Sequence, residues 1–169
     1  YGFLGGETNQ WAPYLYDGIA PVELPHDPNY HFMTDMTDKA VAWIDYQKAL
    51  TPDKPVFIYF APGATHAPHH VPAEWIARWK GKFDQGWDKL REETLARQIA
   101  LGVVPPGTKL APKPPAIKDW DKLSADERRL FAHQAEVFAA FAEFTDHEIG
   151  RMLGAFATVG QADNTLVFY

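Results

Sequence analysis

One apolar segment sets the main limit on the fold of this chain. Residues 55–61 read Pro-Val-Phe-Ile-Tyr-Phe-Ala, without the alternation of polar and apolar side chains that marks a half-exposed strand. A short continuous apolar run, preceded by Pro52-Asp53 and followed by a proline- and glycine-rich loop, is typical of a strand buried on both faces. Such strands belong mostly to parallel sheets covered by helices. The sequence therefore predicts an α/β fold with a mostly parallel sheet flanked by helices.

Helical patterns stand on both sides of this segment. Apolar residues recur at spacings of three and four in several stretches. They predict helices from Thr34 or Thr37 to about Leu50, from about Ala73, from about Trp87 to Leu101, and from Ser124 to about Phe156. Ser124 and Glu127 form a capping box, in which each side chain can bond the other residue's backbone N–H. A second apolar strand is expected at residues 165–169, and this order of elements fits a parallel sheet.

The chain is expected to be an internal piece of a longer protein. Its 169 residues suit one domain, Tyr1 is not a methionine, and the sequence stops inside the apolar run 165–169. Residues 104–116 are dense in proline and read as a surface arm, not as a boundary between domains. We therefore interpret residues 1–169 as the middle portion of a single domain, truncated at both ends.

Composition excludes several classes of function. The formal net charge of -6 argues against nucleic acid as the partner, because phosphate binding needs a basic face. The chain has no cysteine, which excludes disulfides, thiolate zinc sites and a cysteine nucleophile within these residues. No apolar run approaches the about 18 residues of a transmembrane helix, so no membrane-spanning segment is expected.

A histidine-rich loop follows the predicted strand. Residues 66–70 read His-Ala-Pro-His-His, and ligands of α/β proteins bind beyond the carboxyl ends of strands. A histidine placed there can donate a proton, bind a metal or contact an anion. A loop of surface histidines is the plain alternative. A zinc site made by His66, His69 and His70 is less favoured, because Pro68 disfavours the helix that would align them.

Other histidines have simpler explanations. Asp146 and His147 are adjacent on the long predicted helix, so their side chains project to different faces. We interpret them, and His133 on the same helix, as parts of a solvated polar surface.

Four segments of the chain resemble one protein family. The chain is similar to the type I sulfatases, and specifically to the bacterial arylsulfatase branch of the alkaline phosphatase superfamily. The similar segments are residues 1–10 with 15–18, residues 34–40, residues 55–61 with 66–68 and Pro72, and residues 149–153 with 163–169. The third set is the most specific of the four.

The resemblance implies a reaction, a calcium cofactor and a set of catalytic residues. Sulfatases of this type cleave sulfate esters to an alcohol or phenol and sulfate, so a small-molecule sulfate ester would be the substrate. They use a formylglycine made from the first residue of a Cys- or Ser-x-Pro-x-Arg motif, and a calcium ion held by Asp and Asn residues. Of the family's site residues only His66 matches, as the substrate-contacting histidine that assists the departing alcohol. The metal ligands and the formylglycine are expected outside this piece, which alone is expected to be inactive.

Other interpretations stay open at this stage. The parent protein can be a phosphonate monoester or phosphodiester hydrolase of the same superfamily, since these enzymes share much of the site. It can also be a non-catalytic relative that keeps the fold without the nucleophile. An independent histidine-based metalloenzyme is the least favoured alternative, and it predicts zinc binding that depends on His66 and His69.

Overall fold

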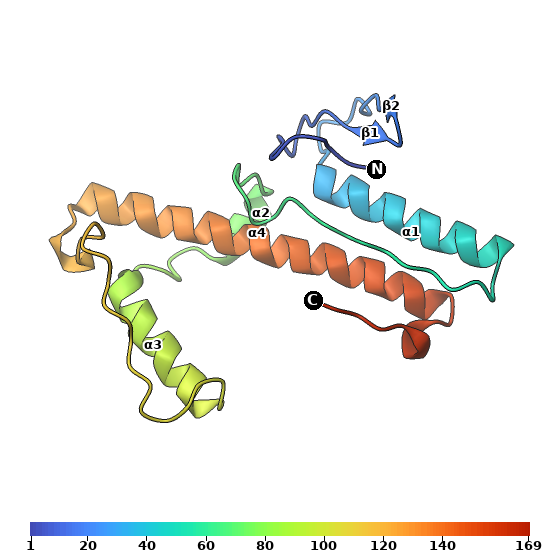
Figure 1. Cartoon of the computed structure of the whole chain (residues 1–169). Helices are drawn as coiled ribbons and strands as arrows, with labels where there is room; N and C mark the ends of the chain where they lie inside the picture. Colours follow the sequence, from blue (N-terminus) through green and yellow to red (C-terminus); the bar gives the residue numbers. More distant parts are fainter. The chain divides into compact units, whose positions relative to one another are not determined.

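The computed structural model describes all residues from 1 to 169 (Figure 1). In chain order the elements are β1 (Tyr16–Asp17), β2 (Ala20–Pro21), α1 (Phe32–Leu50), α2 (Ala73–Arg78), α3 (Gly86–Ala100), the 3-10 helix η1 (Trp120–Lys122), α4 (Ala125–Thr158) and the 3-10 helix η2 (Ala162–Asn164). The chain divides into two compact units. The first unit comprises Tyr1–Pro72 with Phe141–Tyr169, and the second comprises Ala73–Ala140.

Helix α1 and the C-terminal part of α4 build the core of the first unit. Ile44 of α1 packs with Met152, Ala155 and Phe156 of α4, and all four side chains are buried. The predicted helix is confirmed, but its start is not where we expected it. The N-cap is His31, whose ring Nδ1 accepts a hydrogen bond from the Met33 N–H at 3.1 Å, so neither Thr34 nor Thr37 caps the helix. A ring nitrogen does here what a Ser or Asp oxygen usually does.

The expected parallel sheet is not shown, and the structure is mainly helical. Its sheet is the two-stranded antiparallel pair β1–β2, joined through Gly18 at φ +59°. Residues 55–61 are extended but pair with no neighbouring strand, and the same is true of residues 165–169. The reason is physical: an apolar pattern sets where a strand is stable, whereas a sheet also needs a second backbone beside it. Within these residues no such partner is in place.

The extended segment 55–61 nevertheless has one buried side. It runs between α1 and the C-terminal part of α4 (Figure 1), and Val56, Ile58 and Phe60 pack on the core there. Phe57 and Tyr59 point the other way and are 88% and 85% exposed. The run that we expected to be buried on both faces is thus buried on one.

The second unit is built on aromatic side chains. Its buried cluster consists of Trp120 of η1, Leu123 directly after η1, and Ala132 of α4, and Phe83 and Trp87 pack against it. The long helix α4 begins with the predicted capping box. The Ser124 N–H donates to the Glu127 carboxylate at 2.7 Å, and the Glu127 N–H donates to Ser124 Oγ at 3.2 Å. This part of the sequence-based prediction is confirmed.

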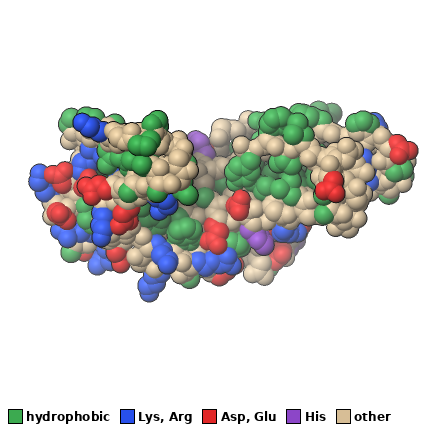
Figure 2. All heavy atoms as spheres, turned by 90° about the horizontal axis from the view of Figure 1, so that it is seen from below, with side chains coloured by type: hydrophobic (Ala, Val, Ile, Leu, Met, Phe, Trp, Pro, Cys, Tyr) green, Lys and Arg blue, Asp and Glu red, His purple; other side chains and the backbone are tan.

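Many large apolar side chains remain on the surface. Figure 2 shows hydrophobic side chains gathered into patches on one face, with charged side chains between them. The most exposed are Ile19, Phe57, Tyr59, Phe168 and Tyr169. No helix combines the length and the apolar character that crossing a membrane requires.

Candidate functional site

The loop at residues 62–72 carries the histidine that the sequence analysis singled out. It follows directly on the extended segment 55–61, and the His66 N–H donates to the Gly63 carbonyl at 2.9 Å. At its far end Val71 is buried, which ties the loop to the first unit. The loop is therefore a folded turn with a defined backbone path.

The His66 ring is exposed and has one nitrogen engaged. Its Nδ1 lies 2.7 Å from the Ala67 carbonyl oxygen, and since a carbonyl only accepts, Nδ1 must carry the proton for this bond. The Glu7 carboxylate lies 3.7 Å from the same nitrogen, at ion-pair distance when the ring is charged. The side chain is 67% exposed. Both contacts involve Nδ1, so they leave Nε2 of this exposed ring available to exchange a proton with a bound molecule.

The N-terminal segment packs against this loop. A side chain on Gly63 would meet the ring of Phe3 at 3.8 Å and the amide of Gln10 at 3.4 Å. The Gln10 N–H donates to the His70 ring Nδ1 at 3.3 Å. Two of the four segments that carry the family resemblance, residues 1–10 and residues 55–68, therefore meet at the candidate site.

His69 and His70 support the loop. His69 donates from Nε2 to the Thr65 carbonyl at 3.2 Å, closing the turn that contains His66. The backbone carbonyl of His70 accepts a bond from His31 Nε2 at 3.2 Å. His69 and His70 hold the backbone in place through these bonds, whereas the contacts of the His66 ring involve its Nδ1.

His31 is a site residue that the sequence analysis missed. Its ring caps α1 through Nδ1, bonds the His70 carbonyl through Nε2, and contacts the edge of Trp11 at 4.7 Å between ring centroids. Burial lowers the pKa of His31 from its ordinary 6.5, against the opposing pull of the His70 bond. The ring is thus held neutral, with its proton on Nε2. The only signal in the sequence was a histidine just before a helix, which is not a usual capping residue.

The other two resembling segments also meet. Glu148 of α4 is buried and accepts bonds from Thr34 at 3.2 Å and from Arg151 at 2.6 Å. The same guanidinium reaches Asp38 of α1 at 2.5 Å. These contacts fasten the first turns of α1 to α4. Asp146 and His147 lie on the exposed side of α4, as the sequence analysis expected.

The residues of this chain do not fit a metal centre or the formylglycine motif. No three His, Asp or Glu side chains come together in a way that could hold a metal ion, so the geometry gives no support to a zinc site at His66, His69 and His70. The chain has no cysteine, and its one serine, Ser124, stands before Ala-Asp-Glu-Arg, with Asp126 where the motif has proline. Ser124 is also occupied as a helix cap.

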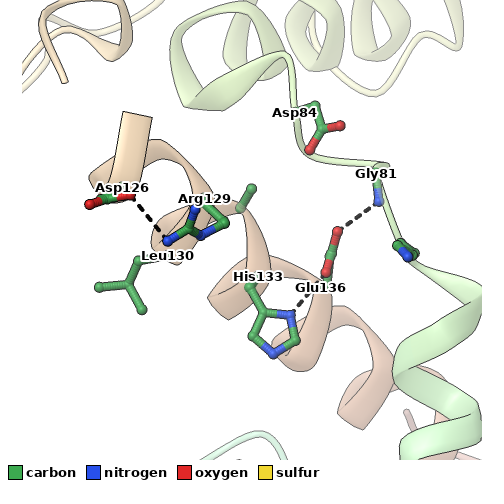
Figure 3. Close-up of a pocket in the computed structure, with 9 residues that line it drawn as sticks. Gly81, Asp84, Asp126, Arg129, Leu130, His133 and Glu136 are labelled. Carbon is green, nitrogen blue, oxygen red and sulfur yellow. Dashed lines mark hydrogen bonds and ion pairs between the residues drawn. The ribbon is translucent and has the colours of Figure 1, made fainter. Parts of the chain in front are cut away.

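A second histidine lies in a pocket of the second unit (Figure 3). His133 and Glu136 of α4 face a hollow of about 620 Å³, together with the turn that follows α2. The buried Glu136 accepts from the Gly81 N–H at 2.7 Å and from His133 Nδ1 at 3.1 Å. Arg129 at the rim pairs with Asp126 at 3.1 Å. His133 is exposed, as expected, but it is oriented by a buried carboxylate, which the sequence pattern did not reveal.

The chain is similar to known proteins over nearly its whole length. The model of the Sulfatase family matches residues 1–169. An uncharacterized sulfatase of Schizosaccharomyces pombe is 35% identical over 179 residues, which cover 98% of this chain and 32% of that protein. An arylsulfatase of Klebsiella aerogenes is 29% identical over 182 residues, which cover 100% of this chain and 38% of that protein. The chain spans about a third of the length of these curated relatives.

Proposed function

Because this chain belongs to the sulfatase family, we propose that the protein containing it hydrolyses sulfate esters of small alcohols or phenols. The observation that carries the proposal is the family match over residues 1–169, and the resemblance seen in the sequence is thereby confirmed. The similarity to an arylsulfatase, at 29% identity, favours aryl esters among the candidate substrates.

His66 is the residue of this chain to which we assign a catalytic role. Cleavage of a sulfate ester leaves negative charge on the departing oxygen, and a proton donated there lowers the barrier. The bond from Nδ1 to the Ala67 carbonyl fixes the ring and uses the Nδ1 proton. The proton for the leaving alcohol therefore comes from Nε2 of the doubly protonated imidazolium ring, which becomes neutral when it donates. We assign His66 both contact with the substrate and the role of general acid for the leaving alcohol.

His31 and His70 are positioning residues in this proposal. A general acid must lie within hydrogen-bond reach of the oxygen that it protonates, so a loose loop would lose most of the benefit. The bonds from Gln10 to His70 and from His31 to the His70 carbonyl tie the loop to the N-terminal segment and to α1. They support a fixed place for the His66 ring.

The same proposal includes the place of this chain in the domain. We place residues 1–169 in the middle portion of one catalytic domain, whose mostly parallel sheet would include segment 55–61. The exposed Phe57 and Tyr59 support this placement, because an extended segment with bare backbone and apolar side chains is suited to pair and pack further. The calcium ion and the formylglycine implied by the family would be held by other residues, since those present here do not fit them.

The proposal is tested by the substrate class of the full-length protein. Initial rates would be measured with 4-nitrophenyl sulfate and with 4-nitrophenyl phenylphosphonate, which share a leaving group and differ in the group that is transferred. We expect the sulfate ester to be hydrolysed with the higher kcat/KM. The isolated 169-residue chain should hydrolyse neither ester.

Two outcomes would contradict the proposal. A higher kcat/KM for the phosphonate would assign the protein to the phosphonate monoester hydrolases, and no turnover of either ester would favour a non-catalytic relative. The His26→Ala variant is a suitable control in these assays, because His26 is an exposed histidine of the first unit that forms none of the bonds described for the loop at residues 62–72.

A further inference from the structure

The second unit contains a cavity that the proposed reaction does not use. It has a volume of about 830 Å³ and lies between α3, the segment from Ala111 to Lys118, and the start of α4. We call this cavity the arm pocket, because the proline-rich arm forms one of its walls. Its volume falls in the range of pockets that bind small organic molecules, about 300 to 1,000 Å³.

The arm pocket is held open by bonds at both ends of its wall. The Arg91 guanidinium of α3 donates to the Ala111 carbonyl at 2.6 Å. At the other end the Trp87 indole N–H donates to the Lys118 carbonyl at 3.1 Å. Between them Lys113 pairs with Asp88 at 2.6 Å. The wall from Ala111 to Lys118 is therefore fastened to α3 at three points, which favours a formed cavity over a collapsed one.

The floor of the arm pocket is aromatic. The rings of Trp87 and Phe131 lie 5.4 Å apart, and Trp87 packs edge-on against the buried Trp120 at 4.8 Å. Leu123, which is also buried, completes the floor. Flat aromatic and aliphatic surfaces of this kind suit a planar apolar body, which can stack or pack edge-on.

One cationic side chain of the arm pocket, Arg91, keeps its positive charge without a carboxylate partner. Two of the three lining cations are neutralised, since Lys113 pairs with Asp88 and Asp119, and Lys118 pairs with Glu127. Arg91 is half-buried, and its bond goes to a neutral carbonyl. A guanidinium has five N–H donors, so Arg91 keeps donors and an uncompensated charge for an anionic group.

We propose that the arm pocket binds a small planar aromatic molecule that carries one anionic group, an aromatic carboxylate or sulfonate. The aromatic floor takes the ring system, and Arg91 takes the anion. This site is distinct from the proposed site of sulfate ester hydrolysis, because all of its residues belong to the second unit, whereas the loop of His66 belongs to the first.

Calorimetric titration of the full-length protein with naphthalene-2-sulfonate tests the proposal, with 2-naphthol as its neutral counterpart. We expect saturable binding of the sulfonate, tighter than that of 2-naphthol. Arg91→Gln should weaken sulfonate binding by about 10-fold, as expected for a lost charge-assisted hydrogen bond, and leave 2-naphthol nearly unchanged. Ala116→Phe, which fills the pocket from the arm, should weaken both ligands.

Two further variants serve as controls. Arg97→Gln removes an exposed arginine of the same helix that does not line the pocket, and it should bind the sulfonate like the unmodified protein. His66→Ala should also keep sulfonate binding. The proposal fails if binding is not saturable, if Arg91→Gln and Arg97→Gln have equal effects, or if Ala116→Phe has none. It also fails if His66→Ala abolishes binding, since the probe would then occupy the proposed catalytic site.

Discussion

Replacing Gly86 by alanine should strongly destabilise the second unit. Gly86 opens α3 with φ +77°, a left-handed conformation that costs a residue with a Cβ about 1 to 2 kcal/mol. The added Cβ would also lie 2.1 to 2.5 Å from three ring atoms of Trp120. Trp120 is buried in the aromatic cluster and cannot swing away without moving its neighbours.

The magnitude follows from adding the two effects. Overpacking of a well-filled core costs about 1 to 3 kcal/mol, so the total for Gly86→Ala should be about 3 kcal/mol. Gly102→Ala is the matched control, because Gly102 has φ +72° and a Cβ added there would meet no atom within 4 Å. It should show the backbone cost alone, about 1 kcal/mol.

Urea unfolding of both variants, followed by tryptophan fluorescence, measures the difference. We expect the transition midpoint of Gly86→Ala to fall well below that of Gly102→Ala, with similar dependence on urea concentration. Equal midpoints for the two variants would refute the reasoning, because they would mean that the Trp120 ring does not occupy the space beside Gly86.

Three further predictions concern stability and pH. Burial lowers the pKa of His31 in the folded state, so the stability that its neutral ring contributes is complete above the ordinary pKa of 6.5 and is lost as the pH falls below that value. His31→Asn, which keeps a capping side chain, should flatten this part of the curve of unfolding free energy against pH. The pKa of Asp119 is lowered to about 2 by Lys113 and Lys122, so the stability that it contributes should be lost as the pH falls from 3.8 to about 2, and Asp119→Asn should remove that loss in acid titrations. Ser124→Ala should lower the free energy of unfolding by about 1 kcal/mol in urea titrations, because it removes the cap of α4, and an unchanged midpoint would contradict that role.

The helices were predictable from the sequence because their determinants are local. The spacing of apolar side chains and the capping box at Ser124 and Glu127 lie within a few residues of one another, and the structure confirms them. The start of α1 was predicted less well. Its cap depends on a histidine that also bonds the His70 carbonyl, 39 residues away, and local preferences do not encode such a contact.

The sheet and the pockets depend on distant parts of the chain. The apolar pattern of residues 55–61 correctly indicated an extended segment, but strand pairing depends on a partner backbone that the pattern does not contain. The carboxylate of Glu136 behind His133 and the bond from Arg91 to Ala111 were not predicted for the same reason. His66 was singled out by its place after an apolar run, which is a local signal.

The role of His66 as a general acid is tested most directly by the dependence of its loss on the leaving group. His66→Ala in the full-length protein would be assayed with a series of aryl sulfates whose phenols have increasing pKa values, with His26→Ala as the control. A poor leaving group needs a donated proton more than a good one, so the loss in kcat/KM should grow along the series and reach about 100-fold or more. The same loss for every phenol, or no loss, would contradict the assignment.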